Sequence, residues 1–178
     1  MVRGALALEQ AGATVLVWPE TPLGALWGEV RGQRSEVKGQ SEKSHLAALH
    51  WGVPEGYVVS KLTQDEQVLW DMLDAYFKGD LAQPAWECFN PQGTEFQRKV
   101  WRALCAIPWG HTISYAELAE RVGSHARAVG GAVGANPVPV LIPCHRVVGK
   151  NGAMTGFSAP GGVQTKKWLL QHEGVGGC

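Results

Sequence analysis

Apolar and polar positions change their spacing along the chain, from strand-like runs to helical stripes. Apolar runs at residues 14–18 and 23–27 flank a break at Pro19 and Pro22. This pattern predicts two short strands that pair as a hairpin. Residues 32–44 are polar and contain glycine, so they predict a loop.

A helical stripe follows the predicted strands. A capping box at residues 63–66 predicts the start of a helix, and Gly79 predicts its end. The apolar positions on one face of this helix are 69, 72, 73, 76 and 77. Such a stripe is typical of core packing rather than of a site. Residues 81–93 contain two prolines and predict a linker.

The second half of the chain predicts three helices in close succession. A capping box at residues 94–97 begins a helix that Pro108 stops, and its inward stripe is Phe96, Val100, Trp101 and Leu104. A second box at residues 114–117 begins a short helix that ends at Gly123. A third helix is expected at about residues 125–134. Two short helices around a glycine-containing turn form a helix-turn-helix pattern.

The third of these helices is built almost entirely from small residues. Ala126, Ala128, Gly130, Gly131, Ala132 and Gly134 surround a single long cation, Arg127. Each glycine weakens a helix by about 1 kcal/mol relative to alanine, so the composition needs a reason in packing or contact. Close approach to a DNA groove and tight packing in the core explain it equally well.

A thiol and an imidazole are neighbours near the end of the chain. Residues 136–139 contain two prolines and predict an extended segment, which leads through the apolar residues 140–142 to Cys144 and His145. A Cys becomes a nucleophile at neutral pH with a base or cation nearby, and both His145 and Arg146 are candidates. Side chains of adjacent residues diverge in extended chain, so a turn or a bridging water is required. An inert buried Cys beside a surface His is the alternative, and it is the commoner case for such a dipeptide.

The remaining residues predict a turn, a loop and a last helix. Residues 149–152 are a turn, and residues 155–162 form a Gly-rich loop whose backbone N–H groups could face a ligand. The loop lacks the Lys-Ser/Thr of a phosphate-binding loop. Residues 166–173 predict a helix with Glu173 near its end.

Charge is distributed unevenly although the net charge is zero. Residues 1–93 hold seven Lys/Arg against twelve Asp/Glu, a balance of −5, and residues 94–178 hold nine against four, a balance of +5. The basic half is therefore the better candidate for binding a polyanion, a moderate signal taken alone. The four Cys show neither C-x-x-C nor zinc-ligand spacing, which favours thiols in a reducing cytoplasm. We expect neither a signal peptide nor a membrane span.

Motifs in the second half carry a family resemblance. The chain from Thr94 to Gly174 resembles the C-terminal domain of the O6-alkylguanine-DNA alkyltransferases, also called methylated-DNA–protein-cysteine methyltransferases. The matching landmarks, in family order, are Phe96-Gln97, Val100-Trp101, Ile107-Pro108-Trp109-Gly110, Ser114-Tyr115, Arg127-Ala128-Val129-Gly130, Asn136-Pro137, Ile142-Pro143-Cys144-His145-Arg146-Val147, Gly161-Gly162 and Trp168-Leu169-Leu170.

The resemblance implies an α/β (α+β) protein of two domains. Residues 1–90 would form a small ribonuclease-H-like antiparallel sheet domain. Residues 91–178 would form a mainly helical, winged helix-turn-helix-like domain that binds DNA and accepts the alkyl group.

The resemblance also implies a reaction. Cys144 would take an alkyl group irreversibly from O6-alkylguanine, and also from O4-alkylthymine, so that each molecule acts once. His145 would accept the thiol proton through water, Glu173 would orient the imidazole, and Asn136 would hold the turn. The Tyr115 hydroxyl would donate to the base ring. No cofactor and no metal are implied.

Substrate and DNA contacts follow from the same resemblance. Arg127 would fill the space left by a flipped base, Tyr115 would push the flanking phosphate, and the small residues Ala126, Ala128 and Gly130 would allow close approach. The pocket would be lined by Val147, Ser158, Lys166 and Phe157, the last at a position where the family commonly has Tyr. The partner is double-stranded DNA carrying O6-alkylguanine, bound by a cytoplasmic monomer (nucleoid-associated if bacterial) that contacts no membrane.

Some features depart from the family pattern. The Gly123-Ser124 turn is two residues shorter, and Ala159-Pro160 is an addition in the Gly-rich loop. No Cys precedes Cys88, so a structural zinc site has no thiolate ligands, and His45 and His50 are expected at the surface. Cys88, Cys105 and Cys178 have no assigned chemistry. A non-catalytic binder of alkyl damage and a hydrolytic Cys-His-Glu enzyme are the alternative functions.

Overall fold

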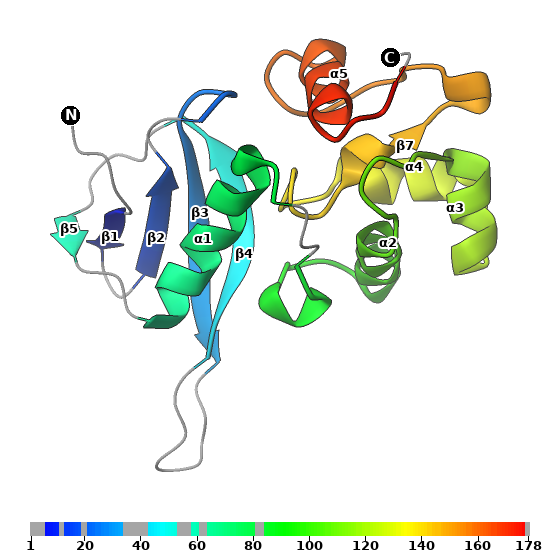
Figure 1. Ribbon diagram of the computed structural model, residues 1–178. Coiled ribbons are helices and arrows are strands. Elements are labelled where there is room, and N and C mark those ends of the chain that lie inside the picture. The colour runs from blue at the N-terminus through cyan, green and yellow to red at the C-terminus, as the bar shows by residue number, and fades with distance from the viewer. Residues whose placement is uncertain are drawn as a thin grey trace. The chain divides into compact units, whose positions relative to one another are not determined.

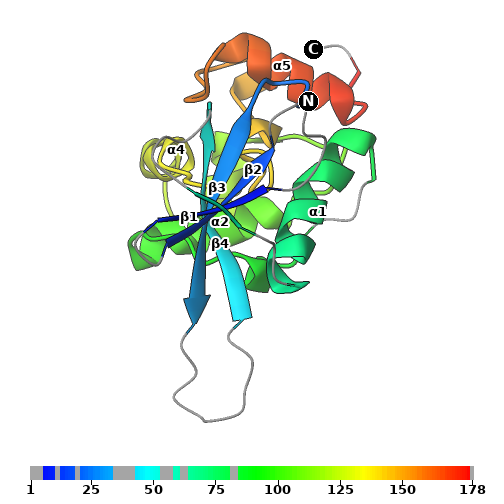
Figure 2. The ribbon, with the colours of Figure 1, turned by 90° about the vertical axis from the view of Figure 1, so that its left-hand side faces the viewer.

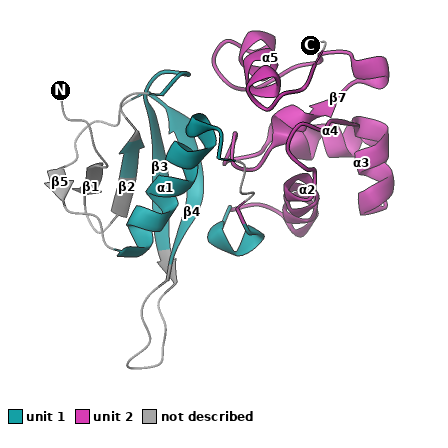
Figure 3. Ribbon diagram, viewed as in Figure 1, with its two compact units in different colours: residues 1–80, 85–91 teal, residues 81–84, 92–178 magenta. Residues whose placement is uncertain are grey.

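The computed structural model describes residues 6–10, 13–18, 21–33, 43–52, 58–60, 64–80 and 84–176. Strands and helices are both present, which confirms the predicted α/β class. The chain divides into two compact units, one of residues 1–80 with 85–91 and the other of residues 81–84 with 92–178 (Figure 3). The domain boundary after residue 90 and the ribonuclease-H-like character of the first domain stay predictions.

An antiparallel sheet forms the first unit (Figure 1). Its strands are β1 (Leu6–Gln10), β2 (Ala13–Trp18), β3 (Leu26–Gln33), β4 (Lys43–Trp51) and β5 (Val58–Ser60), in the order β4-β3-β2-β1-β5. The predicted hairpin is confirmed, because β2 pairs antiparallel with β3.

Two predicted boundaries in this sheet were wrong. The second strand begins at Leu26 rather than at residue 23, because the amide of Gly24 closes a turn on the Thr21 carbonyl and Gly24 has a φ of 91°. The predicted loop at residues 32–44 is strand at both ends, since antiparallel pairing of β3 with β4 continues to Gln33 and Lys43. The middle of that loop lies outside the described residues.

Helix α1 (Gln64–Lys78) lies across one face of the sheet, as Figure 2 shows from a second side. Leu69, Leu73 and Tyr76 are buried, so the predicted stripe is confirmed at its centre, whereas positions 72 and 77 are half-buried. The Trp70 indole donates to the carbonyl of Val17 over 3.1 Å, which joins helix to strand. The first residue of the predicted capping box lies outside the described residues.

The described part of the predicted linker is not a free connection. Its 3₁₀ turn η1 (Trp86–Cys88) contacts β4, Phe89 is only 4% exposed, and the Asn90 amide donates to the Leu46 carbonyl over 3.0 Å. Burial of the apolar side chain therefore docks the segment on the sheet. Strand β4 also holds His45 and His50, which were both predicted to lie at the surface. His45 is only 8% exposed, so its predicted position was wrong, while His50 is partly exposed.

Helices dominate the second unit. They are α2 (Glu95–Cys105), α3 (Tyr115–Val122), α4 (Ala126–Gly134) and α5 (Val163–His172), with short parallel strands β6 (Ile113–Ser114) and β7 (Val147–Val148) between them. Both predicted capping boxes are formed at the starts of α2 and α3. The last helix begins earlier than predicted. Among the residues described, no helix combines the length and the apolar content needed to cross a bilayer.

Trp101 connects α2 to the small-residue helix α4. Its ring is buried, and its Nε1 donates to the Ala132 carbonyl over 2.8 Å. Val100 and Leu104 are buried beside it, whereas Phe96 is only half-buried. Gly93 leaves room for the ring, because a Cβ there would lie 2.5 Å from Trp101 Cη2.

We expect Gly93→Ala and Gly131→Ala to change stability in opposite directions. The new methyl at position 93 would displace a buried, hydrogen-bonded ring, at a cost of about 1–3 kcal/mol. Position 131 lies in α4, where an added Cβ would meet nothing within 4 Å, so alanine should stabilise by about 1 kcal/mol. Urea unfolding of both variants measures the difference, and equal effects would contradict the packing described for Trp101.

Candidate active site

The segment that leads to the thiol is bent, and the predicted extended path for residues 136–139 was wrong. The Asn136 side chain closes the bend, because its Oδ1 accepts from the Val138 amide over 3.0 Å and its Nδ2 donates to the Ile142 carbonyl over 2.8 Å. The Ile142 amide in turn donates to the Val138 carbonyl, and Val140 has a φ of 74°. Local side-chain hydrogen bonds thus override the preference of the prolines for extended chain.

A 3₁₀ turn, η2 (Cys144–Arg146), supplies the turn that a Cys–His neighbourhood requires. Cys144 is 6% exposed, His145 is completely buried and Arg146 is 2% exposed. The alternative interpretation placed His145 at the surface, and that part of it is wrong. The apolar residues 140–142 are buried as well, as predicted.

One buried carboxylate receives both basic side chains of this turn. His145 Nε2 lies 2.6 Å from Glu173 Oε1, at the C-cap of α5. Arg146 donates from Nε to Glu173 Oε2 over 2.7 Å and from its NH2 group to Oε1 over 3.0 Å. Burial raises the pKa of Glu173, but hydrogen bonds and charges of His145 and Arg146 outweigh it and lower the pKa to about 2. Glu173 is thus ionised at neutral pH.

The thiol is held in its protonated form. Burial raises the pKa of Cys144, and a hydrogen bond from Asn136, the charge of Lys166 and the amides of Cys144 and His145 offset only part of that rise. Burial likewise lowers the pKa of His145 against the opposing effect of Glu173. The pair is therefore a neutral thiol beside a neutral imidazole, and a proton must leave the sulfur when the nucleophile acts.

Lys166 and Tyr115 approach the thiol from two further elements. The buried Lys166 Nζ donates to the carbonyls of Val147, over 2.5 Å, and Thr155, over 3.2 Å. Burial raises the pKa of Tyr115, and a hydrogen bond with the Thr155 side chain partly opposes this. The Tyr115 ring also faces Gly130, where a Cβ would lie 4.0 Å from the ring.

The Gly-rich loop carries the remaining predicted pocket residues. Ser158 is exposed, and its hydroxyl donates to the Gly134 carbonyl at the end of α4 over 3.2 Å. Phe157 is half-buried. The added Ala159 and Pro160 form the turn before α5, because their carbonyls accept from the Gly162 amide and the Thr165 hydroxyl.

Four of the five predicted DNA-contacting residues lie on the partly exposed face of α4, and the fifth, Tyr115, begins α3. Ala126 and Arg127 are exposed, Ala128 and Gly130 are half-buried, and Val129, Ala132 and Val133 form the buried face. Small-residue packing and an accessible surface therefore coexist on one helix. The preceding turn is compact because Gly123 is left-handed and the Ser124 amide donates to the Ala119 carbonyl.

Sequence reasoning missed the roles of Arg146 and Thr155 in this site. Arg146 was a candidate for activating the thiol, yet it binds Glu173. Its position beside Cys144 was the available signal. Thr155 links Tyr115 to Lys166, and no local pattern identifies it.

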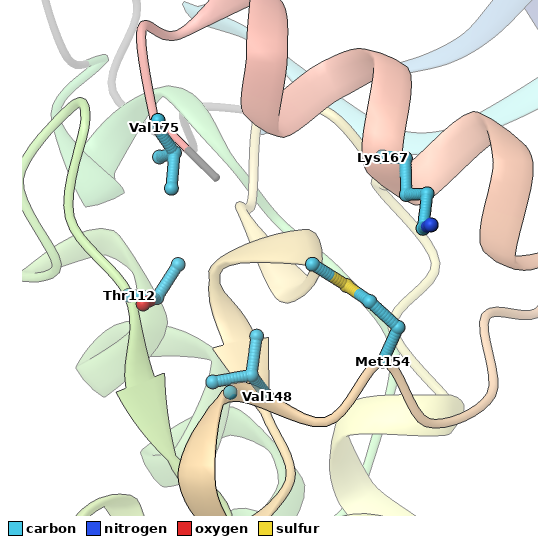
Figure 4. A pocket seen from close by; sticks show the side chains of 7 residues that line it. Thr112, Val148, Met154, Lys167 and Val175 are labelled. Carbon is cyan, nitrogen blue, oxygen red and sulfur yellow. The ribbon is translucent and has the colours of Figure 1, made fainter. Parts of the chain in front are cut away.

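Three further cysteines and one cavity have no predicted role in the site. Cys88 and Cys105 are partly buried, and Cys178 lies outside the described residues. A cavity of about 320 Å³ is lined by none of the predicted site residues (Figure 4), and its lining is Thr112, Val148, Gly152, Met154, Lys167, Val175 and Gly176. Within the described ranges, no three His, Cys, Asp or Glu side chains gather in a way that could hold a metal ion.

Comparisons with known proteins point to one family. Residues 95–175 match the family described as 6-O-methylguanine DNA methyltransferase, DNA binding domain. A methylated-DNA–protein-cysteine methyltransferase of Shigella flexneri is 44% identical over 161 residues, which covers 86% of this chain and 92% of the relative. A protein of the same name from Mycobacterium bovis is 47% identical over 105 residues, 58% of this chain and 62% of the relative.

Solved structures agree with these relatives. The O6-methylguanine methyltransferase of Mycobacterium tuberculosis has a TM-score of 0.67 and 34% identity, and the match covers 88% of this chain and 90% of that one. The Mycobacterium tuberculosis OGT solved in complex with DNA has a TM-score of 0.65 and 35% identity, with the same coverage.

We expect Glu173→Gln to lower the free energy of unfolding by about 3 kcal/mol at neutral pH, because the buried Arg146 loses its counter-charge. The native pKa of about 2 lies below the ordinary 4.5. The stabilisation by the carboxylate is therefore complete above about pH 4.5 and is lost as the pH falls toward 2. Urea unfolding at pH 7 and pH 3 should show the difference between the two proteins shrinking in acid. The exposed Glu120→Gln is the control, with a change within about 0.5 kcal/mol, and equal losses would contradict the ion pair.

Proposed function

Because the chain belongs to the methylated-DNA–protein-cysteine methyltransferase family, we propose that it repairs DNA by taking the alkyl group of O6-alkylguanine onto Cys144. The sulfur attacks the alkyl carbon in line, a C–S bond forms, and the bond between that carbon and guanine O6 breaks with its electron pair left on the oxygen. A thioether has no hydrolysable carbonyl, so the thiol is not regenerated. Each molecule acts once, and O4-alkylthymine is the second substrate.

His145 is the base that takes the thiol proton, through a bridging water. The observation that carries this assignment is the buried His145–Glu173 hydrogen bond of 2.6 Å, made by the residue that follows Cys144. Glu173 fixes the ring and stabilises the imidazolium that forms. Since the pKa of the thiol is raised and that of His145 is lowered by burial, proton transfer accompanies the attack rather than preceding it.

The departing guanine oxygen gains negative charge, and groups around it offset that charge. The Tyr115 hydroxyl donates to the base ring, and the Ser158 amide meets O6. The carbonyls of Cys144 and Val147 accept from the guanine amine. Lys166 holds the Val147 carbonyl in place through the bond described above, and Phe157 lines the alkyl side of the pocket.

DNA is bound through the second unit, and the damaged base leaves the stack. The excess of five positive charges in residues 94–178 favours a polyanion. The related Mycobacterium tuberculosis protein was solved with DNA. Arg127 fills the vacated place in the duplex, and the small side chains of α4 allow the backbone to approach the minor groove. The protein works as a monomer in the cytoplasm, without a membrane.

Two other functions use the same fold or the same side chains. A non-catalytic binder of alkyl damage is disfavoured by a thiol in the nucleophile position. A hydrolytic Cys-His-Glu enzyme would turn over repeatedly on an ester or amide.

Incubation with duplex DNA containing O6-methylguanine should add one methyl group to the protein, because Cys144 is the acceptor. Mass spectrometry of the intact protein and its peptides should map a single increment to Cys144 that saturates at one per molecule. Cys144→Ser should remain unmodified, and Cys105→Ser should react like the wild type. Tight binding without a mass change would favour the non-catalytic binder, and repeated turnover would favour the hydrolase.

Arg127→Ala should slow repair of duplex DNA by roughly 100-fold, because its proposed place is in the stack vacated by the flipped base. Reaction with the free base O6-benzylguanine should change by less than about twofold, since no base has to be extruded. Single-turnover rates on both substrates provide the measurement. Arg121→Ala, another exposed cation of this unit, is the control. Equal losses on both substrates would remove Arg127 from base flipping.

A further inference from the structure

On the basis of the proposed function, we propose that Arg146 is a positioning residue that keeps His145 neutral and ready to accept the thiol proton. This role requires no contact between Arg146 and the substrate. It acts through Glu173, the carboxylate that it shares with His145.

Geometry fixes the guanidinium on that carboxylate. Arg146 engages both oxygens of Glu173, and its NH2 group and His145 Nε2 meet at the same oxygen, Oε1. Its NH1 group donates to the Ile107 carbonyl over 2.5 Å, and its Cζ atom lies 5.8 Å from the centre of the Trp109 ring. The guanidinium is therefore anchored by the α2–β6 connection as well as by α5. A fork of this kind suits Arg and not Lys.

The charges around the His145 imidazole explain why the contact between Arg146 and Glu173 affects the protonation of His145. Glu173 alone favours the imidazolium, and it raises the pKa of His145 through its hydrogen bond and its charge. Burial lowers that pKa most, and the charges of Arg146 and Lys166 lower it further. The groups around His145 are thus Glu173 and Lys166 from α5, and Arg146 and Cys144 from its own turn, with Tyr115 of α3 also near the thiol. Without Arg146, the anion would draw a proton onto His145 before the substrate arrives.

The same fork positions the carboxylate. Gly110, in the turn that follows Trp109, has a φ of 72° and lies so close to α5 that a Cβ there would be 3.2 Å from the Glu173 carbonyl. The end of α5 is therefore held from the side of the Ile107–Gly110 turn through backbone, ring and guanidinium contacts. Loss of the guanidinium removes the charged part of this contact and leaves the backbone part.

The test measures the protonation of His145 directly in the full-length, unreacted protein. Wild type, Arg146→Met and Arg146→Lys are labelled with nitrogen-15 histidine, and the His145 ring signals are identified from their absence in His145→Gln. We expect the midpoint of the His145 titration to move to higher pH in Arg146→Met, and less far in the same direction in Arg146→Lys. Arg121→Met removes an exposed cation of the same unit and should leave the midpoint unchanged.

A charge-compensated double variant sharpens the result. Arg146→Met combined with Glu173→Gln removes both charges, so the midpoint should return to that of the wild type or below it. The single-turnover rate with free O6-benzylguanine at pH 7 should fall by about tenfold or more in Arg146→Met and recover as the pH rises.

An unchanged or lowered His145 midpoint in Arg146→Met overturns the proposal. If that variant does not fold, the same outcome in Arg146→Lys decides it. The titration needs no alkyl transfer, so failure of this proposal is distinguishable from failure of the proposed repair function, which the mass of the wild-type product reports.

Discussion

The buried carboxylate of Glu173 is the constraint on which the second unit depends. A carboxylate withdrawn from water is tolerated only with a counter-charge and well-aligned donors, because its desolvation costs several kcal/mol. Arg146 supplies two donors to it and His145 a third contact. The end of α5, the turn after the thiol and the connection after α2 must therefore meet at one point. The need to pair the Glu173 carboxylate therefore fixes the positions of these distant chain segments relative to one another.

A second constraint links the helix-turn-helix to the thiol. Asn136 follows α4 directly, and its side chain closes the bend that ends at Ile142, two residues before Cys144. Ser158 connects the Gly-rich loop to the last turn of α4, and Lys166 connects β7 to Thr155, the first residue of that loop. A displacement of α4 therefore reaches the thiol through short hydrogen-bonded connections.

Signals within a few residues were enough to predict much of this fold. Both capping boxes of the second unit and the stripe of α1 are local patterns, and the helices formed where these patterns placed them. The docking of Phe89 on β4 depends on a contact with Leu46, about 40 residues away, which no local pattern records. The prolines predicted an extended path for residues 136–139, whereas the family resemblance implied that Asn136 holds a turn there, as the structure shows. The Asn136 side chain competes with the proline preference, and sequence alone does not show which of the two prevails.

Burial and the protonated form of Cys144 suit the single irreversible reaction proposed for it. Thiolates are the form that oxidants and stray alkylating agents attack, so a Cys144 pKa raised by burial keeps the sulfur unreactive while the protein waits for its substrate. The cost is that a base must be ready when the alkyl carbon arrives. In the proposed mechanism, a neutral His145, held by Glu173 and balanced by Arg146 and Lys166, would meet that need without a permanent thiolate. Burial of Cys144 thus suppresses oxidation and stray alkylation of the sulfur. In the proposed alkyl transfer, the same burial makes the reaction depend on the charges around His145.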